Sequence, residues 1–254
     1  MILCIETSTA VLSVALARDG AVVCERVCTE PRSQAALTAP LVKEVLSDAG
    51  ITAGACDAVC VSAGPGSYTG LRVGVSTAKG LAFGAGIPLL SMGTLDILVE
   101  GVRFPVKPGM TEGLSYPAPT RMTSYPAPTR MTSYPAPTGY LVPMIDARRM
   151  EVYTAVYSAG GDRLTEVEAR VIGPDAFAEY LEQGEVLFVG DGALKCQEVI
   201  MHPNARFREA FPLARHMARR AQEDFDAGKF QDVAYFEPFY LKDFIATVSK
   251  KNLW

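Results

Sequence analysis

The sequence feature that most constrains the fold is an approximate internal repeat. Residues 2–25 form apolar runs separated by a polar turn at Glu6 and a glycine turn at Gly20, as is typical of antiparallel strands joined by short turns. Residues 140–166 have the same layout: YLVPMI, a polar turn from Asp146, the run MEVYTAVY, a glycine turn and the run RLTE. Self-similarity on this scale predicts a duplicated unit.

Each half continues in the same way. A helical pattern follows, at Ser33–Ala49 in the first half and Asp175–Gln183 in the second. An apolar strand that runs into glycines comes next, VCVSAGPG at 59–66 and VLFVGDGA at 186–193. Strands that alternate with helices indicate an α/β class. We therefore expect two α/β lobes that face each other across a cleft, with the polar turns and glycine loops at its mouth.

Residues 56–84 combine a strand, a glycine-rich loop and the start of a helix. This layout presents backbone N–H groups and the positive end of a helix to an anion. A glycine–proline–glycine loop also makes tight turns in which hydroxyls only cap the loop, and the lysine of a G-x-x-x-x-G-K-[ST] loop is missing. Both interpretations stay open. The candidates for a phosphate or nucleotide loop are Thr7, Ser8, Gly64, Gly66 and Ser67.

Two helical segments, 33–49 and 70–84, are candidates for a contact surface. The first has a broad apolar stripe, and Pro40 places the start of its regular part near Thr38. In the second, glycine or alanine recurs every four residues from Gly70 to Ala82, so another backbone can come close. This small-residue face packs either on the chain's own sheet or on another subunit. The candidates for partner contact are Leu37, Leu41, Val45, Leu71, Gly74, Val75 and Ala78.

Composition narrows the class of protein. With 254 residues, 49% of them hydrophobic, the chain can bury a large core. A net charge of −4 does not attract nucleic acid, so an RNA role needs a local basic patch or a partner. The six cysteines follow no metal or disulfide spacing. The N-terminus lacks the basic leader of a signal peptide, and no run reaches the roughly 20 apolar residues that span a bilayer. We expect a cytoplasmic protein without membrane contact.

A nine-residue repeat, SYPAPTRMT, separates the two halves. It occupies 115–123 and 124–132, and a third, partial copy follows. Its prolines exclude helices and sheet ladders and favour extended chain. We expect residues 105–139 to be a surface insert or linker, with a proline-rich docking motif as the alternative. The remaining chain divides into lobes at 1–104 and 140–228 and a C-terminal tail at 229–254, and the last helix is a candidate to pack across the lobes.

Four stretches resemble the TsaB (YeaZ) family: ILCIETST, SAGPGSYTGLRVGVSTAKGLA, LVPMIDARRMEVYTAVY and FEPFYLKD. They are spread over nearly the whole chain, and the AGPGSYTGLR run is specific. This family is a bacterial branch of the actin, Hsp70 and sugar-kinase superfamily. The resemblance implies two ribonuclease-H-like lobes that arose by duplication, the second of them degenerate.

The resemblance also implies a function. Proteins of this family are needed for bacterial synthesis of threonylcarbamoyladenosine, next to the anticodon of tRNAs that read codons starting with A. They bind the paralogue TsaD, which transfers the threonylcarbamoyl group, while TsaE joins the complex and TsaC supplies threonylcarbamoyl-adenylate. The implied role is a non-catalytic scaffold and activator of TsaD that contacts it through the two helical segments. A homodimer forms when TsaD is missing, and ATP or ADP at the partner interface stays open.

The histidine positions agree with a role without catalysis. TsaD-type relatives hold a metal with an H-x-x-x-H pair, whose spacing puts both imidazoles on one helix face. Thr94 and Leu98 stand at those positions here, and the chain has only two histidines, His202 and His216. We expect no metal site. The alternative is an ATP-dependent enzyme of the same superfamily, a phosphotransferase or an M22-type peptidase.

Arginines gather around the last helical segment. Arg215, Arg219 and Arg220 flank an apolar stripe that includes Met217 and Ala221. They are either a solvated face balanced by nearby acidic residues or a contact for tRNA phosphates within the complex.

Overall fold

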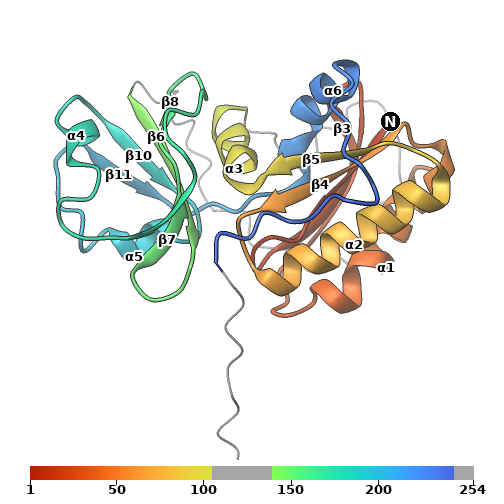
Figure 1. Cartoon of the computed structure of the whole chain (residues 1–254), viewed down its shortest axis with the longest axis horizontal. Helices are drawn as coiled ribbons and strands as arrows, with labels where there is room; N and C mark the ends of the chain where they lie inside the picture. Colours follow the sequence, from red (N-terminus) through yellow and green to blue (C-terminus); the bar gives the residue numbers. More distant parts are fainter. Residues whose placement is uncertain (105–138, 243–254) are drawn as a thin grey trace, which may run out of the picture.

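The computed structural model describes residues 1–104 and 139–242, which form two α/β lobes (Figure 1). The proline-rich repeats, which fall within 105–138, and the final Asp of FEPFYLKD lie outside the described residues. No helix in the described part is long and apolar enough to cross a membrane.

The N-terminal lobe is built on a five-stranded sheet. Its strand order is β3–β2–β1–β4–β5, in which β1 pairs antiparallel with β2 and parallel with β4. The strands are β1 (Ile2–Glu6), β2 (Leu12–Arg18), β3 (Ala21–Cys28), β4 (Ala58–Gly64) and β5 (Leu89–Gly93).

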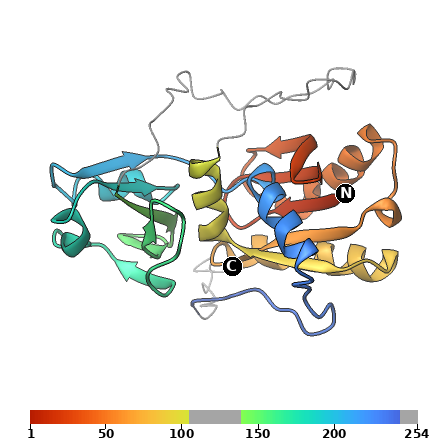
Figure 2. The same cartoon turned by 90° about the horizontal axis from the view of Figure 1, so that it is seen from above.

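Helices cover both faces of this sheet. On one face, α1 (Gln34–Asp48) and α2 (Tyr68–Ala85) pack on the apolar side chains that alternate strand positions direct toward them, such as Leu3, Val59 and Val61. A short 3-10 helix, η1 (Ala53–Ala55), precedes β4, and α3 (Thr94–Arg103) lies between the two lobes (Figure 2).

The second lobe repeats this topology. Its strand order, β9–β7–β6–β10–β11, matches β3–β2–β1–β4–β5 in both pairing and direction, and β8 pairs with β6. This match confirms the predicted duplication. The helices that correspond to α1 and α2, α4 (Ala178–Leu181) and α5 (Ala193–Cys196), have only four residues each. The strands are β6 (Tyr140–Asp146), β7 (Glu151–Thr154), β8 (Tyr157–Ser158), β9 (Glu168–Val171), β10 (Val186–Val189) and β11 (Ala205–Arg208).

After the second lobe, the chain returns to the first one. The 3-10 helix η2 (Ala214–Met217) and α6 (Ala218–Asp226) cover the face of the N-terminal sheet opposite α1 and α2 (Figure 2). Met217 and Ala221 join Ile2, Cys4 and Cys60 in one buried cluster. The N-terminal core is therefore completed by residues more than a hundred positions away in sequence.

The last described segment, residues 229–242, is called the strap. It bridges β5 at Gln231, and Lys79 of α2 donates hydrogen bonds to two of its carbonyls, those of Ala234 and Phe236. The Phe239 N–H donates to the Ala63 carbonyl at 2.7 Å. At its end, Lys242 forms an ion pair with Glu151 of β7, so the strap connects both lobes.

Three local predictions are wrong. Helix α1 begins at Gln34 rather than near Thr38, because the Ser33 carbonyl already accepts two N–H groups and a turn forms ahead of the proline. The run RLTE is not a strand: only Arg163 pairs, in an isolated antiparallel bridge with Tyr157, while the Thr165 hydroxyl accepts the Val156 N–H and β9 begins at Glu168. The predicted helix at 175–183 is limited to the four residues of α4.

Candidate functional site

The polar turn after β1 and the glycine loop after β4 lie against each other. The Ser67 N–H donates to the Ser8 carbonyl at 2.7 Å, and the Thr7 hydroxyl donates to the Gly70 carbonyl at 2.8 Å. Ser67 is also the N-cap of α2, because its Oγ accepts the Gly70 N–H at 3.3 Å. A Cβ atom at Gly66 would collide with the Ser8 carbonyl. The candidate phosphate-loop residues thus come together, but they bind one another.

A buried acidic side chain, Glu6, completes this first loop pair. It is 0% exposed, and its Oε1 accepts the Ser8 N–H at 2.5 Å. Burial raises the pKa of Glu6 to about 7, although hydrogen bonds from Ser8 act in the opposite direction. An N–H group that a phosphate would need therefore already has an acceptor from the chain itself. At this loop the Ser8 N–H is not free for a phosphate, and the carboxylate of Glu6 would face an anion there, while the Ser8 hydroxyl has no partner among the described residues.

The equivalent loop pair of the second lobe is filled by a cationic side chain. Lys195 donates from its Nζ to the Asp146 carboxylate at 2.5 Å and to the carbonyls of Arg149 and Glu151, each at 2.7 Å. The Asp146 N–H donates to the Asp191 carboxylate at 2.9 Å, and burial raises the pKa of Asp191 to about 6. Both loop pairs are thus closed by side chains of their own lobe.

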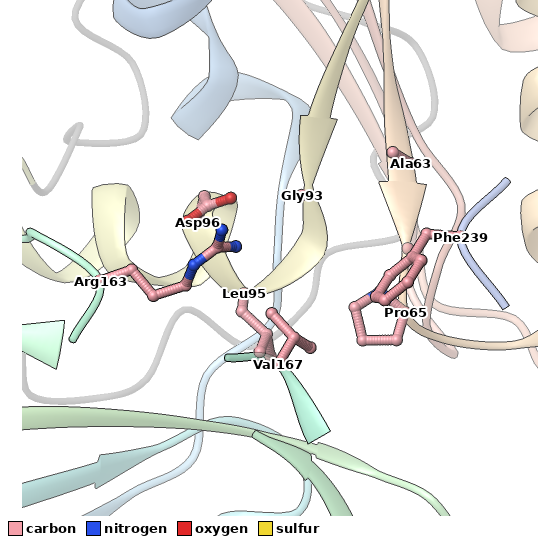
Figure 3. Close-up of a pocket in the computed structure, with 9 residues that line it drawn as sticks. Ala63, Pro65, Gly93, Leu95, Asp96, Arg163, Val167 and Phe239 are labelled. Carbon is pink, nitrogen blue, oxygen red and sulfur yellow. The ribbon is translucent and has the colours of Figure 1, made fainter. Parts of the chain in front are cut away.

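A small pocket lies between the lobes, beside the first loop (Figure 3). It measures about 210 Å³, less than the roughly 300 Å³ at which small-molecule sites usually begin. Figure 3 shows Arg163 of the second lobe extending toward Asp96 of α3, and Phe239 of the strap beside Pro65. The Tyr157 hydroxyl donates to Asp96 at 2.7 Å, and burial together with that carboxylate raises the pKa of Tyr157. The bond between Tyr157 and Asp96 thus crosses the cleft that the sequence predicts.

The positions of the metal-binding histidine pair lie in the first turns of α3. Thr94 and Leu98 are both buried there. Within residues 1–104 and 139–242, no three His, Cys, Asp or Glu side chains are grouped so that they could hold a metal ion.

Most of the residues predicted to contact a partner are inside the lobe. Val45, Leu71, Val75 and Ala78 are at most 3% exposed, and Gly74 packs directly against the Thr7 side chain. This burial corrects the expectation for these five positions. Gly74 packs on the β1 turn of the same chain, and Val45, Val75 and Ala78 belong to the core cluster between the helices and the sheet.

The opposite sides of α1 and α2 are the sides that reach the surface. Leu37 and Leu41 remain partly exposed on α1. A groove of about 450 Å³ runs between the two helices, with Ala39 and Lys43 on one side and Thr77 and Leu81 on the other. On α2, Phe83 is 83% exposed. The sequence signal for this face is the set of polar and small residues on the side of each helix opposite its apolar stripe.

The arginines of the last helix have acidic partners. Arg215 pairs with Glu25 at 3.0 Å, and both side chains are largely buried. Arg219 pairs with Glu100 at 2.7 Å, and Arg220 pairs with Asp224 at 3.3 Å. Their charges are paired within the chain, but Arg215 and Arg219 meet Glu25 and Glu100 of other elements and do not form the solvated face of the first interpretation.

Known proteins resemble this chain in sequence and in fold. A family model described as "TsaD: tRNA N6-adenosine threonylcarbamoyltransferase" matches residues 29–115. Two solved structures from Pseudomonas aeruginosa share the fold. One is YeaZ, with a TM-score of 0.71 and 24% identity over 94% of this chain and 99% of that one. The other is a protein described as similar to peptidase YEAZ, with a TM-score of 0.72 and 23% identity over 95% of this chain and 99% of that one. The predicted fold of two ribonuclease-H-like lobes is confirmed.

Curated relatives extend the comparison to the family. The tRNA threonylcarbamoyladenosine biosynthesis protein TsaB of Bacillus subtilis is 29% identical over 65% of this chain and 58% of that protein. The protein of the same name in Escherichia coli K12 is 30% identical over 96% of each chain. With a match that spans nearly the whole of both proteins, the chain belongs to the TsaB family of tRNA threonylcarbamoyladenosine biosynthesis proteins.

Proposed function

We propose that the chain is a non-catalytic partner that stabilises and activates a TsaD-type transferase during synthesis of threonylcarbamoyladenosine in tRNA. The observation that carries this proposal is the nearly full-length match to the Escherichia coli protein, whose name assigns it to that biosynthesis. In this proposal TsaE and tRNA are reached through the complex, and the isolated chain uses the same contact face to form a homodimer.

The two closed loop pairs support the absence of catalysis. An enzyme of this architecture that handles ATP needs backbone N–H groups aimed at phosphate oxygens. Here Glu6 accepts the N–H of Ser8 in the first lobe, and Lys195 lies across the corresponding turn of the second. Opening the first loop would leave the buried Glu6 carboxyl without its Ser8 N–H, and opening the second would remove the acceptors of the Lys195 ammonium group.

The exposed sides of α1 and α2 are the proposed contact face for TsaD. The groove between them is apolar at its base, where Val42 and Leu46 lie, and Lys43 stands at its rim. An exposed phenylalanine is a typical anchor of a protein interface. Phe83 of α2 is 83% exposed, so we include it in the proposed contact face, although it does not line the groove.

A matched pair of substitutions tests this face. Phe83→Arg places a charge in the proposed interface, and we expect it to weaken TsaD binding at least about 30-fold, the equivalent of roughly 2 kcal/mol. Met201→Arg is the control, because Met201 is 85% exposed on the second lobe and Phe83 is 83% exposed on α2. Co-purification with TsaD and the melting temperature are measured for both. Equal retention of TsaD by the two variants would reject this face.

A further inference from the structure

The turn between β6 and β7 presents two neighbouring arginines. Arg148 and Arg149 are both exposed, and neither forms an ion pair with an acidic side chain in the described part of the chain. The arginines of the last helix differ, because each of them has an acidic partner. The guanidinium groups of the turn are therefore available to an external anion.

The backbone of this turn is held in an unfavourable conformation. Arg148 has φ +71° and Arg149 has φ +52°, in the left-handed region that costs a side chain-bearing residue about 1–2 kcal/mol. The Asp146 carboxylate accepts the Arg148 N–H at 2.8 Å, and Lys195 donates to the Arg149 carbonyl. Asparagine or glycine would adopt this conformation more easily. These two hydrogen bonds therefore hold Arg148 and Arg149 in a backbone conformation that is unfavourable for arginine.

Aromatic rings lie at the same edge of the molecule. The rings of Tyr68, at the start of α2, and Tyr240, on the strap, are 4.8 Å apart between centroids, and the Arg72 guanidinium lies 5.5 Å from the Tyr68 centroid. Two residues after Tyr240, Lys242 pairs with Glu151, which directly follows the turn segment. Figure 1 shows the strap, in dark blue, ending between α2 and β7.

We name Arg72, Tyr68, Tyr240, Arg148 and Arg149 the hairpin–strap surface. We propose that it binds a single-stranded loop of a structured RNA, with arginines on phosphates and a tyrosine ring against a base. Unstacked bases and their phosphates are recognised by this combination of side chains. The nearby acidic groups Asp146 and Glu151 are paired with Lys195 and Lys242, which leaves Glu237 of the strap as an opposing charge near Tyr240. A 37% exposed tyrosine ring together with arginines that lack acidic partners among the described residues fits a base and its phosphates, so RNA is the occupant that we propose, and loss of a protein partner in place of tRNA is an outcome of the test.

This proposal rests on the proposed function, and the test separates the two. The chain is mixed with TsaD and an unmodified tRNA transcript, and both TsaD retention and tRNA affinity are measured over a range of salt concentrations. Arg148→Asn with Arg149→Gly removes both charges and suits the left-handed backbone, so we expect an equal or higher melting temperature. We expect tRNA affinity to fall about tenfold at physiological salt, and the slope of log affinity against log salt to decrease by about 1.4.

Two controls give the test its specificity. Arg18→Ala with Arg206→Ala removes the same charge from exposed positions elsewhere and is expected to leave tRNA affinity unchanged. Tyr240→Ala is expected to weaken tRNA binding about fivefold or more, whereas Tyr240→Phe retains the ring and the affinity.

Four outcomes would overturn the proposal. They are an unchanged tRNA affinity in R148N/R149G, an equal loss of tRNA affinity in R18A/R206A, no tRNA binding by the wild-type complex, and loss of TsaD binding instead of tRNA binding. Failure of the proposed function is a different result, in which wild-type chain does not retain TsaD at all.

Discussion

At the scale of single residues, the most informative position is Glu6. It lies at the end of a fully buried strand, and it accepts the backbone N–H of Ser8 in the turn that follows. The sequence predicts a polar turn here and the hydroxyl groups that cap it. It does not predict that the carboxylate folds back into the protein, because this depends on how closely Gly66 and Gly70 let the second loop approach.

The raised pKa of Glu6 predicts a pH-dependent contribution to stability. Between the ordinary value of 4.5 and the native value of about 7, the folded state binds a proton that the unfolded state does not. The free energy of unfolding therefore loses about 3 kcal/mol from this residue as the pH rises through that window. Glu6→Gln removes the titration. We expect the variant to gain about that amount relative to wild type between pH 4.5 and 7, measured by urea unfolding, and a difference that does not vary with pH would contradict the assignment.

At the scale of elements, helix α2 shows what glycine spacing means. Gly70 and Gly74 lie against the turn of β1, where a Cβ would collide with Thr7, whereas Gly80 has no neighbouring atom within 4 Å. We expect Gly70→Ala to lower the free energy of unfolding by about 2 kcal/mol or more. Gly80→Ala is expected to raise it by about 0.5–1 kcal/mol, because glycine is unfavourable in an open helix. Similar effects of the two substitutions would show that the small-residue face is not packed on the turn.

The last helix allows a second comparison of neighbouring positions. Arg219 meets Glu100, whose side chain is only 10% exposed, whereas Arg220 is 48% exposed and pairs with Asp224 one turn away, which also pairs with Lys229. We expect Arg219→Glu to lower the free energy of unfolding by about 2–3 kcal/mol and Arg220→Glu by less than about 1 kcal/mol. Arg220→Glu is also expected to leave tRNA binding by the complex unchanged. A loss of tRNA binding in this variant at an unchanged melting temperature would show that the last helix contacts tRNA after all.

The helices also show which features a sequence pattern predicts and which it does not. Periodicity identified the segments of α1 and α2 to within two residues at each end, because both bury one strong apolar face, although the regular part of α1 begins earlier than Pro40 suggests. The same periodicity identifies the residues of the core and not those of the contact surface. Val45, Leu71 and Val75, which we predicted as contact residues, are therefore buried in the lobe. In the second lobe, α4 begins only after Phe177, whose left-handed backbone (φ +64°) cannot continue a helix. Neither this conformation nor a side chain–backbone bond such as that of Thr165 is visible in a pattern of apolar and polar residues.

At the scale of the whole molecule, the duplication accounts for most of the architecture. Two sheets with the same strand order follow from two similar halves of the chain, and the similarity of those halves is visible in the order of their apolar runs and turns. The return of α6 to the first sheet and the path of the strap along β5 and α2 are not visible in this way. These are contacts between segments far apart in sequence, and no local pattern specifies them.

The central claim is that this two-lobed protein assists a transferase without performing chemistry. Its most direct test measures ATP turnover and threonylcarbamoyl transfer to tRNA for the chain alone, for TsaD alone and for the two together. We expect the chain alone to be inactive in both reactions, because its loops are closed by Glu6 and Lys195, and to raise the rate of transfer when TsaD is present. Rapid ATP hydrolysis by the chain alone, or a transfer rate by TsaD that does not respond to the chain, would contradict the account.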